Sequence, residues 1–103
     1  MAERMDTMIT SKQRAYLRGL AQNIDAIFQI GKNGIHDNQI KQIADALEAR
    51  ELVKITLLDS SPDDKKVIAN ELARLTESDV VQIIGKKITL YKRSKEKPTI
   101  ELP

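Results

Sequence analysis

The sequence predicts a single α/β domain, a two-layer sandwich in which helices pack on a small four-stranded mixed sheet. Apolar residues recur at helical spacing in three segments, and four short runs rich in β-branched residues have the character of strands. These segments follow one another in the order α-β-α-β-α-β-β. The chain has 103 residues, which is long enough to bury one core but not two.

The first helix is expected to run from Ser11 to about Gln22. Thr10 and Gln13 have the spacing of a capping box, in which each side chain bonds the other residue's backbone N–H. The apolar face of this helix consists of residues at helical spacing, namely Leu17, Leu20, Ala21 and Ile24.

The remaining elements follow in order along the chain. Strands are expected at residues 26–30, 52–58, 80–84 and 88–91, and helices at residues 37–50 and from Pro62 onward. Asp37 and Asn38 suit a helix start, because short acceptors satisfy exposed amides and an acid suits the positive pole. Ser61 suits the cap of the last helix, and Pro62 suits its first position.

The last helix is expected to bury Ile68, Leu72 and Leu75, with Ala69 and Ala73 beside them. This face would pack on the sheet.

The order of the elements also predicts how the strands pair. Two strand-helix-strand units imply parallel neighbours joined by right-handed crossovers. Between the last two strands, Gly85-Lys86-Lys87 suits a tight antiparallel hairpin. Beyond Lys92 the chain is charged and contains Pro98, so little order is expected there.

Composition argues against several classes of protein. Because the chain has no cysteine, neither a disulfide nor a zinc knuckle is expected. His36, the single histidine, is expected to be a turn or cap residue, and no nucleophile-base-acid set can be assembled around it. We therefore expect no enzyme, no cofactor and no metal. No apolar run is long enough to span a bilayer, and the first residues lack the layout of a secretion signal, so a cytoplasmic location is expected.

The net charge of +2 is small, but its distribution is uneven. Basic residues are in excess over residues 7–34 and 80–103, and acidic residues are in excess over residues 35–79. If the two basic ends meet in space, they would form one positively charged surface.

The loop Gly31-Lys32-Asn33-Gly34 is the sharpest local signal, because it joins an expected strand to a helix N-terminus. Unpaired amides and the helix dipole favour anions at such a place. Glycines at both ends permit positive φ and let a phosphate chain approach without a Cβ in the way. A plain strand-to-helix turn explains the same four residues equally well.

Two further groups of basic residues lie outside this loop: Lys12, Arg14 and Arg18 on the first helix, and Lys86, Lys87 and Lys92 at and after the hairpin. Each group alone fits an ordinary solvated surface, since lysine is common at turns and sheet edges. The coincidence of three independent basic features on a nearly neutral chain favours nucleic-acid binding.

The aromatic residues are Tyr16, Phe28 and Tyr91. Phe28 and Tyr91 lie in strand patterns and are expected to be in the core or half-buried. A sheet that stacks bases on aromatic rings is therefore disfavoured. Tyr16 is expected to be exposed on the first helix.

Three separated motifs carry a family resemblance: SKQRAYLR at residues 11–18, QIGKNG at 29–34, and VQIIG with ITLYK at 81–85 and 88–92. In this order they resemble the CRM domain (chloroplast RNA splicing and ribosome maturation), and the single-domain bacterial YhbY-like proteins are the nearest in length. The resemblance covers roughly residues 8–93. One departure is Lys92, where arginine would be expected; the charge is kept but a fork-like phosphate contact is lost.

The resemblance implies a sandwich similar to the C-terminal domain of a bacterial translation initiation factor. It also implies binding to structured RNA, with association with precursors of the large ribosomal subunit. The RNA-contacting role of the family's glycine-flanked loop, analogous to the loop of KH domains, falls on Gly31, Lys32, Asn33 and Gly34. On this basis Lys12, Arg14 and Arg18 would share that surface, and Lys86 and Lys87 would extend it. Residues 1–7 would be a disordered extension and residues 94–103 a charged tail.

As a small basic binder, the chain is expected to be a monomer. Two other functions stay open. One is a protein-protein module whose acidic middle segment, including Asp63, Asp64 and Glu71, binds a basic ribosomal protein. The other is a nucleotide-binding or small-ligand enzyme. The loop lacks both the dinucleotide and the P-loop spacing, so the enzyme ranks lowest.

Overall fold

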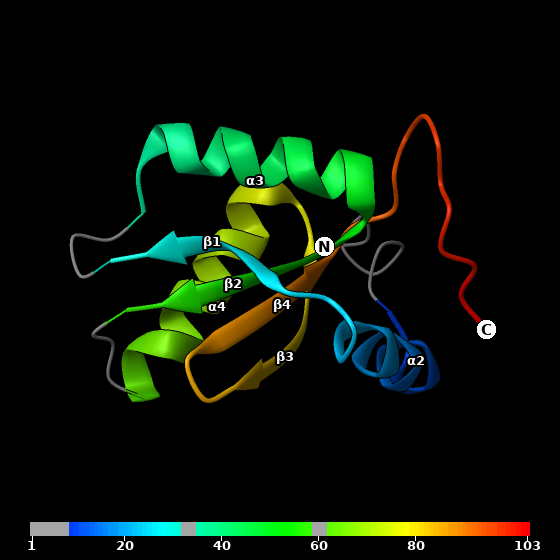
Figure 1. Ribbon diagram of the computed structural model, residues 1–103, viewed down its shortest axis with the longest axis horizontal. Coiled ribbons are helices and arrows are strands. Elements are labelled where there is room, and N and C mark those ends of the chain that lie inside the picture. Colours follow the sequence, from blue (N-terminus) through cyan, green and yellow to red (C-terminus); the bar gives the residue numbers. More distant parts are fainter. Residues whose placement is uncertain (1–8, 32–34, 59–61) are drawn as a thin grey trace.

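The computed structural model describes residues 9–31, 35–58 and 62–103 (Figure 1). Its elements are α2 (Ser11–Ala21), β1 (Ala26–Ile30), α3 (Asp37–Arg50), β2 (Leu52–Leu57), α4 (Pro62–Thr76), β3 (Asp79–Ile84) and β4 (Lys87–Tyr91). The predicted α/β class, the order α-β-α-β-α-β-β and the four-stranded mixed sheet are confirmed. Element boundaries differ from the expected ones by one residue at most. The expected extension at residues 1–7 lies outside the described residues.

The strands lie in the order β1-β2-β4-β3. β1 and β2 are parallel, as predicted, while β4 is antiparallel to both β2 and β3. The second strand-helix-strand unit departs from the prediction, because β2 and β3 are not neighbours. The hairpin strand β4 lies between them, so its backbone forms hydrogen bonds with a neighbouring strand on each side.

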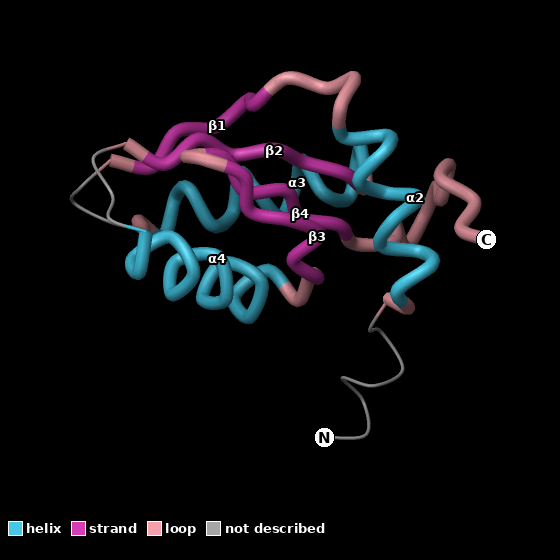
Figure 2. Tube along the Cα trace, turned by 90° about the horizontal axis from the view of Figure 1, so that it is seen from below, coloured by secondary structure: helices cyan, strands magenta, loops and turns pink. Residues whose placement is uncertain are grey.

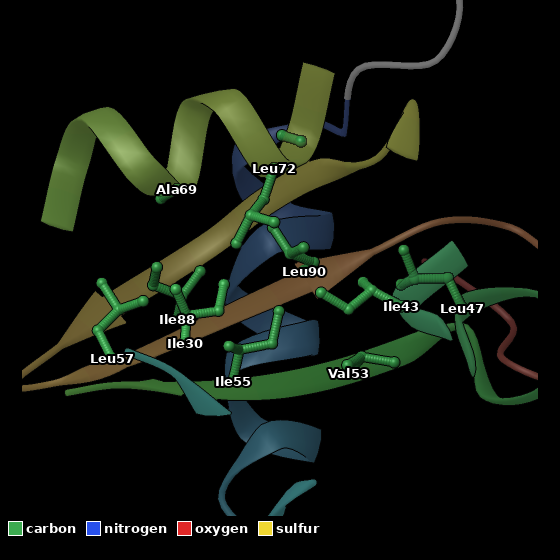
Figure 3. Close-up of a cluster of buried hydrophobic side chains, with 11 residues drawn as sticks. Ile30, Ile43, Leu47, Val53, Ile55, Leu57, Ala69, Leu72, Ile88 and Leu90 are labelled. Carbon is green, nitrogen blue, oxygen red and sulfur yellow. The ribbon is translucent and has the colours of Figure 1, made fainter. Parts of the chain in front are cut away.

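Helices α3 and α4 cover one face of the sheet. The buried cluster between them consists of aliphatic side chains, which are Ile30, Ile43, Leu47, Val53, Ile55, Leu57, Ala69, Leu72, Ala73, Ile88 and Leu90. Figure 3 shows this cluster on one side of the strands and α2, in blue, on the other. One expected member is wrong: Leu75 is 36% exposed. It follows the buried Ala73 by two residues, which turns it roughly 200° around the helix from that side chain.

Helix α2 packs on the opposite face of the sheet, at the end near the C-terminus (Figures 1 and 2). Its Leu17 and Ala21 are fully buried against Leu52, Val81 and Tyr91. Because successive residues of a strand point to opposite faces, Leu52 belongs to this second cluster and Val53 belongs to the first. Only one end of this face is covered by a helix.

The starts of α2 and α3 are marked by local hydrogen bonds. The Thr10 N–H donates to Gln13 Oε1 at 2.9 Å and the Gln13 N–H donates to Thr10 Oγ1 at 3.1 Å, which confirms the capping box. His36 is the residue before α3, and its N–H donates to Gln39 Oε1 at 3.1 Å. His36 is therefore a cap residue, as predicted. The proposed Ser61 cap lies outside the described residues.

The C-terminal tail is more ordered than expected, because two carboxylates bind the tail backbone. They belong to Glu48 within α3 and to Glu51 at the end of this helix. Glu51 is fully buried and has a φ of 68°. Its carboxylate accepts the N–H groups of Ser94 at 2.7 Å and of Thr99 and Ile100 at 2.8 Å. Glu48 accepts the Ser94 hydroxyl at 2.7 Å. Charge-assisted bonds of this kind are strong, so they can hold a segment that has no helix or strand.

Replacing Glu51→Gln should lower the free energy of unfolding. An amide keeps one acceptor oxygen, but its NH2 group would face the Ser94 N–H that now donates to Glu51 Oε2. We expect a loss of about 1.5–3 kcal/mol, the scale of one hydrogen bond to a charged group, in urea denaturation. The control is Glu96→Gln, an exposed carboxylate of the same tail, which should change little. Equal stability of the two variants would contradict this account.

The tail should also make stability depend on pH in the acid range. Burial by itself raises the pKa of Glu51, but the N–H groups of Ser94, Ile100 and Thr99 outweigh it and lower that pKa below its ordinary 4.5. A lowered pKa in the folded state contributes stability that is present above the ordinary value and is lost as pH falls through the lowered one. Thermal unfolding followed below pH 4.5 should show this loss, with a weaker dependence in Glu51→Gln. Identical pH profiles for the two proteins would contradict it.

Candidate nucleic-acid interface

One edge of the sheet brings together the end of β1 and the β3–β4 turn, with β2 between them. The Leu58 N–H donates to the Ile30 carbonyl at 2.8 Å, and the Leu57 N–H donates to the Lys86 carbonyl at 2.7 Å. Gly31 therefore lies on the same edge as Lys86 (Figure 1). Of the glycine-flanked loop, Lys32, Asn33 and Gly34 lie outside the described residues, so their placement stays a prediction.

The β3–β4 turn is the tight hairpin that the sequence predicted. Gly85 has a φ of +58°, a conformation that costs other residues steric strain. The Lys65 ammonium donates a hydrogen bond to the Gly85 carbonyl. Lys86 and Lys87 are exposed beside it, so the turn presents two cations at the same edge as Gly31.

The basic residues of α2 lie away from this edge and do not form a single line. Arg14 is half-buried, and its Nε donates to the Val80 carbonyl at 3.4 Å. Arg18 is one turn further along the same flank and is exposed. Lys12 precedes Arg14 by two residues, which turns it roughly 200° around the helix axis. Lys12 and the two arginines therefore face different sides.

Lys92 lies at the far end of β4, away from the loop. Its N–H donates to the Glu51 carbonyl at 2.9 Å. The tail N–H groups of Lys95 and Glu96, the Ser94 hydroxyl and, more weakly, the charge of Lys92 lower the pKa of Glu48. The structure thus places Lys92 beside a carboxylate and separates it from Gly31 and Lys86.

The uncovered half of the sheet face carries a row of four residues, of which the sequence argument singled out only Lys87. Register aligns one residue from each strand across all four strands, and these are Gln29, Thr56, Lys87 and Ile84. We call them the open row. Gln29 and Lys87 are exposed, Thr56 is half-buried, and Ile84 is 64% exposed. The alternating pattern of β2 could have placed Thr56 on this face, but the row required the strand order.

The other two rows of this face are progressively covered by α2. In the middle row, Lys54 and Gln82 flank Thr89, which is 1% exposed. The Lys54 ammonium donates to the Ala21 carbonyl at the end of α2, at 2.7 Å. The last row contains Leu52 and Tyr91, which pack under α2. The open row is thus bordered by a helix on one side and by the loops on the other.

A hollow of about 540 Å³ lies between the end of α2, the start of β1 and the tail. It is lined mostly by aliphatic side chains, among them Leu20, Ile24, Leu52 and Ile100. Among the described residues, no group of three or more acidic or histidine side chains could hold a metal ion. In the described part of the chain, no helix has the length and apolar character needed to cross a membrane.

The aromatic residues lie where they were expected. Tyr91 is 5% exposed, and Phe28 is half-buried against the cluster under α3 and α4. Tyr16 is 44% exposed on α2. The open row therefore contains no aromatic ring.

The site is a sheet edge with a glycine at a strand end and a cationic hairpin, on a two-layer α/β sandwich. Residues 9–92 match the CRS1/YhbY (CRM) domain, and the chain belongs to this family. It is 51% identical over 96 residues to the Bacillus subtilis protein named Probable RNA-binding protein YqeI, covering 93% of this chain and all of that one. It is 33% identical over 97 residues to a Haemophilus influenzae RNA-binding protein, covering 94% of this chain and 97% of the relative.

A solved structure supports the same assignment. The solution structure of a hypothetical Staphylococcus aureus protein, described as a candidate RNA-binding protein, matches with a TM-score of 0.82 and 56% identity. The match covers 93% of this chain and all of that chain. The predicted family is confirmed, and the fold is shared with a solved relative.

The hairpin that presents Lys86 and Lys87 should depend on Gly85. We expect Gly85→Ala to lower stability by about 1–2 kcal/mol, since an L side chain is strained at positive φ. The control is Gly19→Ala in exposed α2, where an added Cβ meets nothing within 4 Å. That variant should gain about 0.5–1 kcal/mol, because alanine favours the helix. Urea denaturation measures both, and a neutral Gly85→Ala would contradict the assigned turn.

Proposed function

We propose that this chain is a non-catalytic RNA-binding protein that contacts structured ribosomal RNA and assists assembly of the large ribosomal subunit. The observation that carries the proposal is membership of the CRM family together with relatives named as RNA-binding proteins. The position of Gly31, Lys86 and Lys87 at one edge of the sheet supports this proposal. The protein would act in the cytoplasm as a monomer.

In this proposal the glycine-flanked loop binds the RNA backbone. Gly31, Lys32, Asn33 and Gly34 precede α3, whose first-turn N–H groups and dipole favour a phosphate. Lys32 would neutralise one phosphate, and Lys86 and Lys87 at the same edge would neutralise its neighbours. Backbone contacts of this kind fix register and orientation more than they read sequence.

The basic residues of α2 would extend the footprint away from the loop. Arg14 and Arg18 lie on one flank of α2, and the middle row separates this helix from Lys87. Lys12 and Lys92 face other directions, so the proposal gives them smaller roles. Shape and backbone geometry, more than base identity, would then decide the target.

The protein-protein alternative gains no specific support. Glu71, one of its acidic residues, is paired with Arg74 within α4, with Arg74 Nε donating to Glu71 Oε1 at 3.2 Å. The side chains of Asp63 and Asp64 are outside the described part. The enzyme alternative gains no specific support either. The hollow is lined by aliphatic side chains together with Asn23, Asp25, Arg50 and Lys54, which offer no hydroxyl, thiol or imidazole group.

Titration against a structured ribosomal RNA fragment and a matched DNA duplex tests the proposal. RNA should be preferred, and affinity should fall with salt with a log–log slope of about −3 to −5 if roughly five phosphates are neutralised. The double variant Lys32→Asp/Asn33→Asp should lose binding while circular dichroism shows it folded.

The matched control is Lys66→Asp/Asn70→Asp, which makes the same charge changes on the exposed surface of α4. It should bind as the unmodified protein does. If the loop variant also binds normally, the loop is only a turn. A salt-insensitive complex would contradict a phosphate-based mode of binding.

A further inference from the structure

We infer that the open row is the binding surface for a single-stranded RNA segment, which lies on the sheet between the arginine flank of α2 and the hairpin lysines. This inference rests on the proposed function and adds the place and the strandedness of the RNA. Three features of the described residues carry this inference. They are the flank of α2 that faces the open row, the charged side chains around the open row, and the groups on the sheet that can hydrogen-bond to bases.

The direction of α2 comes from contacts on its two flanks. On one flank, Gln13 Nε2 donates to the Pro103 carbonyl at 3.3 Å, and Leu20 lies with Ile100 and Leu102 of the tail in the second cluster. The tail lies at the outer end of the molecule, beyond α2 (Figure 1). On the other flank, Arg14 bonds β3 at Val80. The Arg14 flank, which also carries Arg18, therefore faces the open row.

The open row and the middle row carry basic side chains and no acidic one. Lys87 belongs to the open row, and the exposed Lys86 follows it at the turn. Arg18 is exposed on the facing flank of α2. The surface thus has cations at two borders, which suits a polyanion that crosses it.

The surface also carries neutral polar groups, beside Lys54 and Lys87, that can bond bases. Gln29 and Gln82 each offer an acceptor and two donors, and Thr56 offers a hydroxyl. Ile84 adds an exposed aliphatic side chain. Watson–Crick base edges are free in a single strand and paired within a duplex, so these neutral hydrogen-bonding groups favour unpaired RNA.

The size of the surface fits a short segment. Four strands at the usual spacing give a width of about 14 Å. In RRM domains, a four-stranded sheet stacks about two or three bases on its aromatic rings. Without an aromatic ring in the open row, base contacts here depend on amide and aliphatic groups, and so the cationic borders should supply most of the affinity.

The test is fluorescence anisotropy with a labelled, unstructured single-stranded RNA, and with an RNA duplex of equal length as competitor. Arg18→Glu and Gln29→Glu should each weaken binding of the single strand about tenfold, the scale of one lost backbone or base contact. The duplex should compete poorly.

Two controls match these changes. Lys66→Glu reverses a charge on exposed α4, and Gln42→Glu adds the same charge as Gln29→Glu on exposed α3. Both should bind the single strand within about twofold of the unmodified protein, since surface charges beyond a Debye length are screened.

The outcomes separate the two proposals. If the unmodified protein binds structured RNA but the open-row variants behave like their controls, or if the duplex competes as well as the single strand, this inference is overturned and the proposed function stands. If the unmodified protein binds no RNA of either kind, the proposed function fails and this inference fails with it.

Discussion

The pairing of β4 between β2 and β3 is the constraint on which the rest of the structure depends. It puts the hairpin turn beside the ends of β1 and β2, where backbone hydrogen bonds from Leu57 and Leu58 join the three. It also aligns Gln29, Thr56, Lys87 and Ile84 in one row across the sheet. A hairpin paired only at the outer edge of β3 would leave Lys87 distant from β1, and no surface would join them.

The two faces of the sheet are buried unequally, and this difference creates the candidate interface. Helices α3 and α4 cover one face fully with the main aliphatic cluster. On the other face α2 covers only the end that carries Leu52 and Tyr91. The tail supports α2 from its outer side, and the buried carboxylate of Glu51 holds the tail through backbone N–H groups. The direction of Arg14 and Arg18 thus depends indirectly on a carboxylate that is remote from them.

Much of this could be predicted from local sequence signals. Periodicity located every described element, and the Thr10–Gln13 spacing identified a real capping box. The strand order could not be derived. The same succession of elements is compatible with β4 at the outer edge of β3 and with β4 between β2 and β3. The bound tail was missed because backbone bonds to Glu51 have no periodic signature. The split between Lys12 and Arg14 was available from helical geometry alone, since two residues turn the helix by roughly 200°.

The most direct test of the central claim is a map of backbone amide chemical shifts in the ¹⁵N-labelled protein as a short single-stranded RNA is added. The account predicts that the largest changes fall at Gln29, Thr56, Gln82 and Lys87, with Arg18 at the border. It predicts small changes on the exposed side of α4, for example at Asn70. Changes confined to α3 and α4, with the open row unaffected, would contradict it.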